Sequence, residues 1–287
     1  MTEARPTEPV LLSDDPAPRI RRLTLNRPGK RNALNDDLRG ALFDALRTAD
    51  RDREISVLVI RGAGPAFCAG YDLGSANHGV ERSIAKVDGW WSRHVVNNWF
   101  EMWDMATPII AQVHGYCLAG GTELATACDL VYVAEDASIG YPPVRLMSPP
   151  DMQWQTWMMG LRHGMEALLT GDSMSGTEAA ERGFANRAYP LDALEGAVLA
   201  IAERIAKIPL DLLALNKRAA HRAMDAMGIR TGMRATADIQ ALGFHQPASR
   251  EYLETFATKG VSAALSDRDR QFGDYRERGG DSTQRSD

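Results

Sequence analysis

A chain of 287 residues is long for one compact domain, so we expect one large domain with a smaller appendage. A hydrophobic content of 44% supports a substantial core, and a net charge of −5 without a dominant basic cluster argues against a nucleic-acid partner. The three cysteines are odd in number and lie in apolar or glycine-rich stretches, which favours a reducing compartment over a disulfide scaffold. No segment resembles a signal peptide or has the ~20 apolar residues of a membrane helix, so the sequence predicts a cytoplasmic protein.

The first two hundred residues alternate between short apolar strands and helical patterns. We expect residues 1–15 to be a flexible tail, although residues 10–12 could open a strand. A strand is predicted at 20–26, and a helix follows that Asn35 caps and whose apolar residues recur at helical spacing. Apolar runs at 55–60, 108–113 and 130–134 predict buried strands. This order is typical of an α/β fold with mostly parallel pairing.

Two later regions have a different character. Residues 73–107 are crowded with aromatic side chains, which belong either to the core or a subunit interface, or to a pocket for a bulky ligand group. After residue 208 the pattern is wholly helical, with stretches at 210–227, 233–242 and 250–265. We therefore divide the chain into an α/β core (1–207) and a helical region (208–287) that we expect to form oligomers. Residues 279–287 are expected to be disordered.

Two glycine-containing segments each follow a predicted strand. Residues 65–73 read PAFCAGYDL and residues 113–124 read VHGYCLAGGTEL. Small residues let backbone N–H groups approach a ligand, and a helix that begins near Gly120 would point its unsatisfied N–H groups at the same place. Two amides that converge on one oxygen form an oxyanion hole.

Five ordered motifs resemble the crotonase, or enoyl-CoA hydratase/isomerase, family. They are LNRP with NALN at 25–35, FCAGYDL at 67–73, GYCLAGGTE at 115–123, DLVYVA at 129–134 and LLTG at 168–171. The resemblance implies a crotonase-type core of repeated β-β-α turns arranged as a spiral. It also implies that the C-terminal helices form a homotrimer or a dimer of trimers, and that the substrate is an acyl-CoA thioester, with coenzyme A as part of the substrate and no separate cofactor.

The resemblance also implies roles for individual residues. The amides of Tyr71 and Gly120 would hold the thioester oxygen, and a coenzyme A channel would be lined by Lys30, Arg31, Ala33, Ala69, Gly70, Asp72 and Leu73. For Lys30 and Arg31 a solvated basic turn is an equally good interpretation. No Cys or His pair has metal-ligand spacing, so no metal is expected.

The acid and base groups are less completely matched. Glu123 is one helical turn after Gly120 and can point to the space that the amides face, where the family uses a glutamate as acid/base. On spacing alone a surface glutamate would be the more common interpretation, and the resemblance to the family reverses that preference. The family's second glutamate is replaced by Pro143, which transfers no protons. Asp151, eight residues further on, is either a second catalytic acid or, as we favour here, the cap of a helix that begins at Met152.

These features predict hydration or isomerisation of an enoyl-CoA. One alternative is another crotonase chemistry on a bulky CoA ester, such as C–C hydrolysis or decarboxylation, for which one carboxylate can suffice. Another is a protein that binds acyl-CoA without catalysis, which the loss of the second glutamate favours and the intact oxyanion segments oppose.

Overall fold

The computed structural model describes residues 8–74 and 95–273 and shows an α/β fold with two sheets. The strands of the larger sheet are, in spatial order, β1 (Leu11–Ala17), β2 (Ile20–Leu25), β3 (Val57–Gly62), β5 (Ile109–Val113), β7 (Leu130–Ala134) and β10 (Arg187–Tyr189). Strand β1 pairs antiparallel with β2, and the other neighbours are parallel. The expected flexibility of residues 11–15 was wrong because they form β1; residues 1–7 lie outside the described residues.

The smaller sheet contains the short strands β4 (Ala66–Cys68), β6 (Tyr116–Leu118), β8 (Ser138–Gly140) and β9 (Met174–Ser175). The first three are parallel, and β9 pairs antiparallel with β8. A strand of the large sheet, a turn, a strand of the small sheet and a helix succeed one another along the chain. This repetition confirms the predicted β-β-α core, and the four strands predicted between residues 20 and 134 are present within two residues of their expected bounds.

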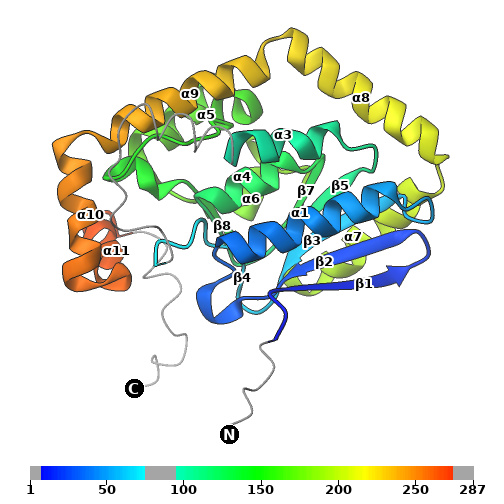
Figure 1. Cartoon of the computed structure of the whole chain (residues 1–287), viewed down its shortest axis with the longest axis horizontal. Coiled ribbons are helices and arrows are strands. Elements are labelled where there is room, and N and C mark those ends of the chain that lie inside the picture. Colours follow the sequence, from blue (N-terminus) through cyan, green and yellow to red (C-terminus); the bar gives the residue numbers. More distant parts are fainter. Residues whose placement is uncertain (1–7, 75–94, 274–287) are drawn as a thin grey trace, which may run out of the picture.

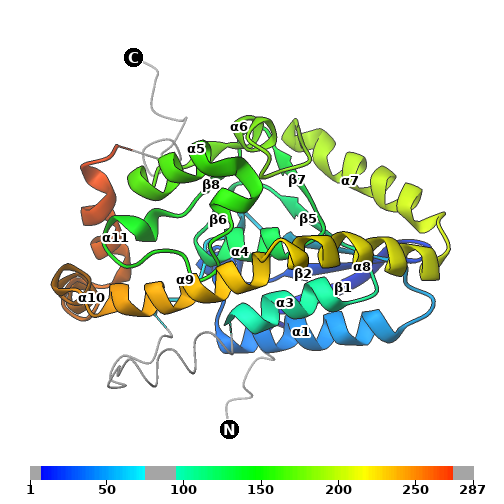
Figure 2. The same ribbon diagram turned by 90° about the horizontal axis from the view of Figure 1, so that it is seen from above.

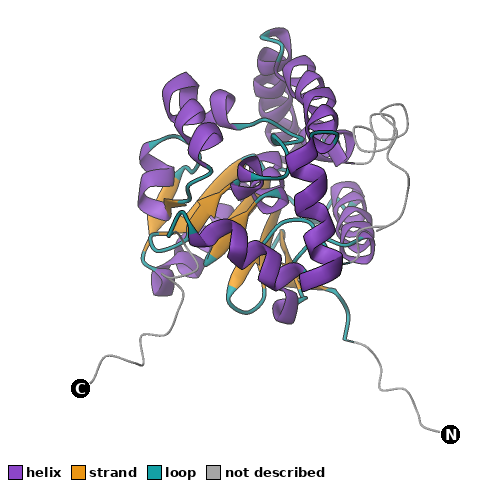
Figure 3. Ribbon diagram, turned by 90° about the vertical axis from the view of Figure 1, so that its left-hand side faces the viewer, coloured by secondary structure: helices purple, strands orange, loops and turns teal. Residues whose placement is uncertain are grey.

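Helices surround the two sheets, as Figure 3 shows by the strands in the interior and the helices outside them. The helices of the core are α1 (Asp36–Arg51), α3 (Asn97–Asp104), α4 (Gly120–Ala127), α5 (Gln155–Thr170), α6 (Gly176–Glu181) and α7 (Leu191–Ala206). Short 3-10 helices lie at η1 (Pro28–Lys30) and η3 (Pro142–Arg145). The predicted cap of α1 is confirmed, because the Asn35 side chain accepts a hydrogen bond from the Leu38 amide at 3.0 Å.

The C-terminal part is helical, as predicted, and consists of α8 (Leu210–Ala226), α9 (Ile229–Phe244), α10 (Pro247–Lys259) and α11 (Val261–Arg270). Helices α8 and α9 run across the core on the side of α3 (Figures 1 and 2). The single helix predicted over residues 250–265 is two helices, because Gly260 adopts a φ of 79° that ends α10. Residues 279–287 lie outside the described residues.

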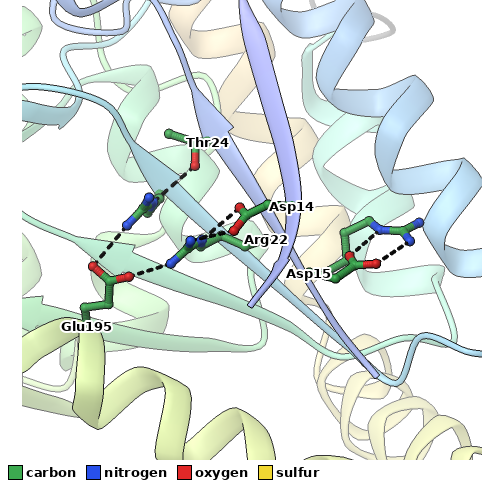
Figure 4. Close-up of polar contacts among 7 residues, drawn as sticks. Asp14, Asp15, Arg22, Thr24 and Glu195 are labelled. Atoms are coloured by element: carbon green, nitrogen blue, oxygen red, sulfur yellow. Dashed lines mark hydrogen bonds and ion pairs between the residues drawn. The ribbon is translucent and has the colours of Figure 1, made fainter. Parts of the chain in front are cut away.

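Ion pairs join the edge of the large sheet to a helix (Figure 4). Arg22 on β2 pairs with Asp14 on β1 at 2.6 Å and with Glu195 on α7 at 2.5 Å. These contacts tie the edge strand β1 to β2 and hold α7 against the sheet. Within the described residues, 8–74 and 95–273, no helix is long and apolar enough to cross a membrane.

Candidate active site

The two glycine-containing segments lie backbone against backbone. Strands β4 and β6 pair in parallel, which places the turns that follow them side by side. The contact requires glycine: a Cβ atom on Gly121 would lie 2.2 Å from the Cys68 carbonyl oxygen, and one on Gly70 would lie 3.2 Å from the Gly120 nitrogen. Segments that are fifty residues apart in the sequence therefore meet at the start of α4.

The N–H groups of Tyr71 and Gly120 both belong to this meeting point. Leu34 donates to the Gly70 carbonyl at 2.8 Å and accepts from the Asp72 amide at 2.9 Å, so the intervening Tyr71 N–H points to the opposite side, away from Leu34. Gly120 is the first residue of α4, and its N–H has no acceptor within the helix. Ala119, just before it, has a φ of 50°, a strained conformation for a residue with a side chain.

Glu123 lies in the first turn of α4 and is fully buried. The Tyr71 hydroxyl donates to Glu123 Oε2 at 2.6 Å. Burial raises the pKa of Glu123 from 4.5 to about 7, and the polar groups around it, with the Tyr71 hydroxyl the largest contribution, oppose this rise. The prediction that Glu123 points inward rather than to the surface is confirmed, and the carboxyl is poised to exchange a proton near neutrality.

Three aromatic residues complete the surroundings of this carboxyl. The Trp99 indole N–H on α3 donates to the Tyr71 hydroxyl oxygen at 3.2 Å. Tyr141, directly after β8, is buried, and its burial together with the nearby Asp151 and Glu123 raises its pKa well above the ordinary value. The sequence suggested a role only for the Tyr71 amide. Two features of the sequence could have indicated these side-chain contacts: the aromatic residue at position 71 and the cluster of aromatic residues around Trp99.

The position of Asp151 corrects a prediction. Helix α5 begins at Gln155 with Trp154 as its N-cap residue, so Asp151 does not cap a helix at Met152. Asp151 is instead 1% exposed, and together with Glu123 it raises the pKa of Tyr71, whose largest contribution comes from burial. Two buried carboxyl groups thus share one set of tyrosines.

Pro143 lies in η3, where its carbonyl accepts a hydrogen bond from the Met147 amide at 2.8 Å. Its position in a turn explains why proline is tolerated, because a fixed φ suits the start of a 3-10 helix. It offers no proton-transfer group at the position of the family's second glutamate.

The residues expected to line the coenzyme A channel form a turn packed on the segment of Tyr71. The Ala69 amide donates to the Arg31 carbonyl at 3.0 Å, which holds the turn to the strand end. Lys30 and Arg31 are exposed, and Arg31 lies over the Tyr116 ring at 4.8 Å. Ala33 and Leu73 are half-buried on the same side. The turn therefore lies next to the segment that carries the Tyr71 amide.

Two residues hold this turn in place and were not singled out from the sequence. Arg27 pairs with Asp72 at 2.7 Å and also donates to the Ala33 carbonyl. Burial is the largest single effect on the pKa of Asp72 and raises it, but the hydrogen bonds from Arg27 and the Gly74 amide, with the charges of Arg27 and Lys30, together lower it. Asn32, fully buried, donates to the Ala63 and Ala66 carbonyls at 2.9 and 2.7 Å. Asp72 thus supports the channel by fixing its turn.

Most of the remaining aromatic residues belong to the core. Phe100 and Trp103 are buried in α3, and the Trp154 indole donates to the Thr122 hydroxyl at 3.0 Å. Trp90 and Trp91 lie outside the described residues. The His114 ring contacts the Gly64 carbonyl at 2.8 Å.

The repeated β-β-α core, with its two converging turns and helical C-terminal part, is the crotonase fold. The chain belongs to the enoyl-CoA hydratase/isomerase family, whose profile matches residues 17–266. It is therefore an enzyme of the enoyl-CoA hydratase/isomerase type.

Individual relatives agree with this assignment. The crystal structure of an enoyl-CoA hydratase from Mycobacterium smegmatis has a TM-score of 0.86 at 30% identity, covering 93% of this chain and 95% of that chain. An enoyl-CoA hydratase/isomerase from Xanthobacter autotrophicus Py2 has a TM-score of 0.83 at 31% identity, covering 92% and 98%. A Mycobacterium tuberculosis relative, EchA13, whose name places it among the enoyl-CoA hydratases, is 34% identical over 241 residues, or 75% of this chain and 74% of the relative.

Proposed function

We propose that this enzyme converts an acyl-CoA thioester to its enolate, with the Tyr71 and Gly120 amides as donors to the thioester oxygen. The support is geometric: both N–H groups belong to segments that lie in contact, and the positive end of α4 adds to the field at that point. Removal of one donor from an oxyanion hole typically costs about 10²–10³ in rate. Coenzyme A would lie along the turn that carries Lys30 and Arg31.

The observation that carries the proposal is the environment of Glu123. A fully buried carboxyl whose hydrogen-bond partner is a neutral phenol, with a pKa of about 7, can take a proton from carbon and return it. Charged partners would hold the carboxylate ionised. Glu123 is therefore the proposed acid and base.

Of the family's reactions, we favour movement of a double bond by a proton shift from one carbon to another. In this reaction a carboxylate removes a proton from one carbon, the oxyanion hole holds the resulting enolate, and a carboxyl returns a proton to a second carbon, so no water is consumed. Glu123 and Asp151 are both buried beside the same tyrosines, which suits transfer at two carbons. Pro143 removes the second glutamate that hydratases use to activate water.

Hydration is the second candidate, and the names of the relatives favour it. Asp151 would then activate the water in place of the absent glutamate. The two candidates differ in their product: an isomerase returns the same atoms with the double bond moved, whereas a hydratase adds one water across the double bond.

The test is incubation with 2-enoyl- and 3-enoyl-CoA thioesters of several chain lengths in deuterium oxide, with products identified by mass spectrometry and NMR. We expect interconversion of the two alkenes and deuterium at the carbon next to the thioester, both lost in Glu123→Gln. A hydroxyacyl product that forms faster than the isomer would replace isomerisation by hydration. Binding of acyl-CoA without either reaction or exchange would reject the catalytic proposal.

Self-association is proposed on the exposed apolar residues of the helices. Leu161 and Leu169 on α5 are 64% and 77% exposed, and Leu212 and Leu215 on α8 are 51% and 57% exposed. We propose that these surfaces are covered in a homotrimer or a dimer of trimers. Light scattering at micromolar concentration should give three or six times the monomer mass, and a fully active monomer would contradict the proposal. The cytoplasmic location stays a prediction from the sequence.

A further inference from the structure

A chain of two hydrogen bonds leads to Glu123, and its polarity is fixed. The Trp99 indole N–H can only donate, so the Tyr71 hydroxyl oxygen accepts from it at 3.2 Å. The phenolic proton of Tyr71 then points to Glu123 Oε2, 2.6 Å away. The hydroxyl has one proton, so it cannot donate to the substrate without giving up its contact with Glu123.

The ring of Tyr71 is held independently of its hydroxyl. A Cβ atom on Gly120 would lie 2.6 Å from ring atom Cε2 of Tyr71, so the ring rests on the first residue of α4. Its backbone is fixed by the two hydrogen bonds that Leu34 makes with Gly70 and Asp72. Loss of the hydroxyl alone should therefore leave the ring and both amides where they are.

The contact distinguishes the two oxygens of Glu123. Oε2 is occupied by the Tyr71 hydroxyl, whereas Oε1 is buried without a hydrogen-bond partner within residues 8–74 and 95–273. A proton bound by the carboxyl is least hindered on Oε1, because on Oε2 it would displace the phenolic proton. Oε1 is thus the oxygen left to exchange a proton with a ligand.

We propose that Tyr71 is a positioning residue whose hydroxyl, ordered by Trp99, occupies Glu123 Oε2 and so assigns proton exchange with the substrate to Oε1. The inference rests on the proposed role of Glu123 as acid and base. It gives Tyr71 two separate functions: its amide faces the thioester oxygen and its side chain orients the acid. Tyr71 itself keeps its proton, because burial and the neighbouring Glu123 and Asp151 hold the pKa of the phenol well above its ordinary value.

The hydroxyl also favours the ionised form of Glu123. Burial raises the pKa of the carboxyl, and the Tyr71 hydrogen bond is the largest contribution that opposes burial. The other titratable or charged groups around the pair are Tyr141, Asp151, Cys68 and Arg39. Removal of the hydroxyl should accordingly raise the pKa of Glu123 beyond about 7 and leave less of the base ionised at neutral pH.

The test compares the pH profiles of kcat/KM for the wild-type enzyme, Tyr71→Phe and Trp99→Phe. Tyr71→Phe should move the acid-side midpoint up by about one unit, which makes the rate below the midpoint roughly tenfold lower and largely preserves the plateau at high pH. Trp99→Phe, which keeps the phenol but loosens its orientation, should move the midpoint in the same direction by less. Tyr132→Phe on β7, a buried tyrosine outside the site, is the matched control and should leave the midpoint unchanged.

An unchanged midpoint with full activity in Tyr71→Phe would overturn the proposal. Equal loss of rate at every pH would overturn it as well, because the phenol would then transfer the proton itself. The carboxyl titration of Glu123, followed by infrared difference spectroscopy in the ligand-free protein, separates this inference from the proposed function. An upward shift in Tyr71→Phe supports the contact even if no acyl-CoA is turned over, and an identical titration in both proteins rejects it even if the enzyme is active.

Discussion

Helix α4 has a carboxylate near each of its ends, and the two carboxylates have different partners. Glu123, in its first turn, contacts the neutral hydroxyl of Tyr71. Asp129, two residues beyond its end, contacts the Lys217 amine at 2.8 Å and the His221 ring at 2.8 Å. A neutral donor leaves a buried carboxyl free to gain or lose a proton, whereas the Lys217 amine forms an ion pair with Asp129. The difference separates a group suited to chemistry from one suited to holding the fold together.

All three N–H donors of Lys217 have partners near Asp129. Its buried amine donates to the Met102 carbonyl at 2.8 Å and the Thr107 carbonyl at 3.1 Å, in addition to Asp129. Three donors therefore meet three acceptors. Because Lys217 belongs to α8, this cluster anchors the C-terminal helices to the core beside β5 and α3.

The largest effect is expected from Glu123→Gln. The amide keeps the size of the side chain but cannot accept a proton from carbon, so turnover should fall by about 10²–10⁴-fold, or roughly 3–5 kcal/mol of barrier. Calorimetric affinity for acyl-CoA should change little, because both amides and the basic turn remain. Glu195→Gln, on the surface of α7, is the control and should keep the full rate. Normal turnover in Glu123→Gln would contradict a catalytic role for Glu123 and so its proposed difference from Asp129.

The opposite result is expected at the other end of α4. Lys217→Met leaves a half-buried Asp129 and two carbonyls without their common buried donor, and should lower the free energy of unfolding by about 3 kcal/mol. The rate per folded molecule should be nearly unchanged. Lys259→Met, which removes an exposed ion pair with Asp267, is the matched control and should leave the free energy of unfolding nearly unchanged. Chemical denaturation measures the free energy of unfolding of both variants. Equal losses would show that the buried contacts of Lys217 contribute no more to stability than an exposed ion pair.

Stability should also depend on pH through Glu123. Its pKa rises from 4.5 in the unfolded chain to about 7 in the folded protein, so between these values the folded state binds more protons. Stability should then fall as pH rises through this window, by about 3 kcal/mol in total. Glu123→Gln has no such loss, and its stability relative to wild type should increase from pH 4.5 to pH 7. Parallel stability curves for the two proteins would contradict the raised pKa.

A smaller effect is expected from Asp151→Asn. If Asp151 returns the second proton, the rate of isomerisation should fall about 10²-fold, or roughly 2.7 kcal/mol, while hydrogen exchange at the carbon that Glu123 deprotonates persists. Deuterium incorporation measured beside isomer formation separates the two steps. Loss of both steps together would assign one shared role to the carboxyl pair, and loss of neither would leave Glu123 as the only acid.

The sequence predicted the parts of the site that depend on local pattern. The strands that precede residues 65 and 114, the start of α4 at Gly120 and the inward position of Glu123 all follow from apolar periodicity, glycine placement and the family motifs. The partners of Glu123 could not be predicted, because Tyr71, Trp99 and Tyr141 come from three segments whose contact depends on tertiary packing. The role of Asp151 was predicted wrongly because aspartate is a good N-cap residue and a helix was plausible from Met152. The helix in fact begins at Gln155.

The most direct test of the account is the titration of Glu123 itself. Infrared difference spectra of the wild-type protein minus Glu123→Gln, recorded across pH without ligand, isolate the carboxyl band of this one residue. The neutral hydrogen-bond partners and full burial predict a midpoint at about pH 7. A midpoint near the ordinary value of 4.5 would show that the carboxyl is ionised at neutral pH like a solvated one, and would contradict its proposed role as the exchanging acid and base.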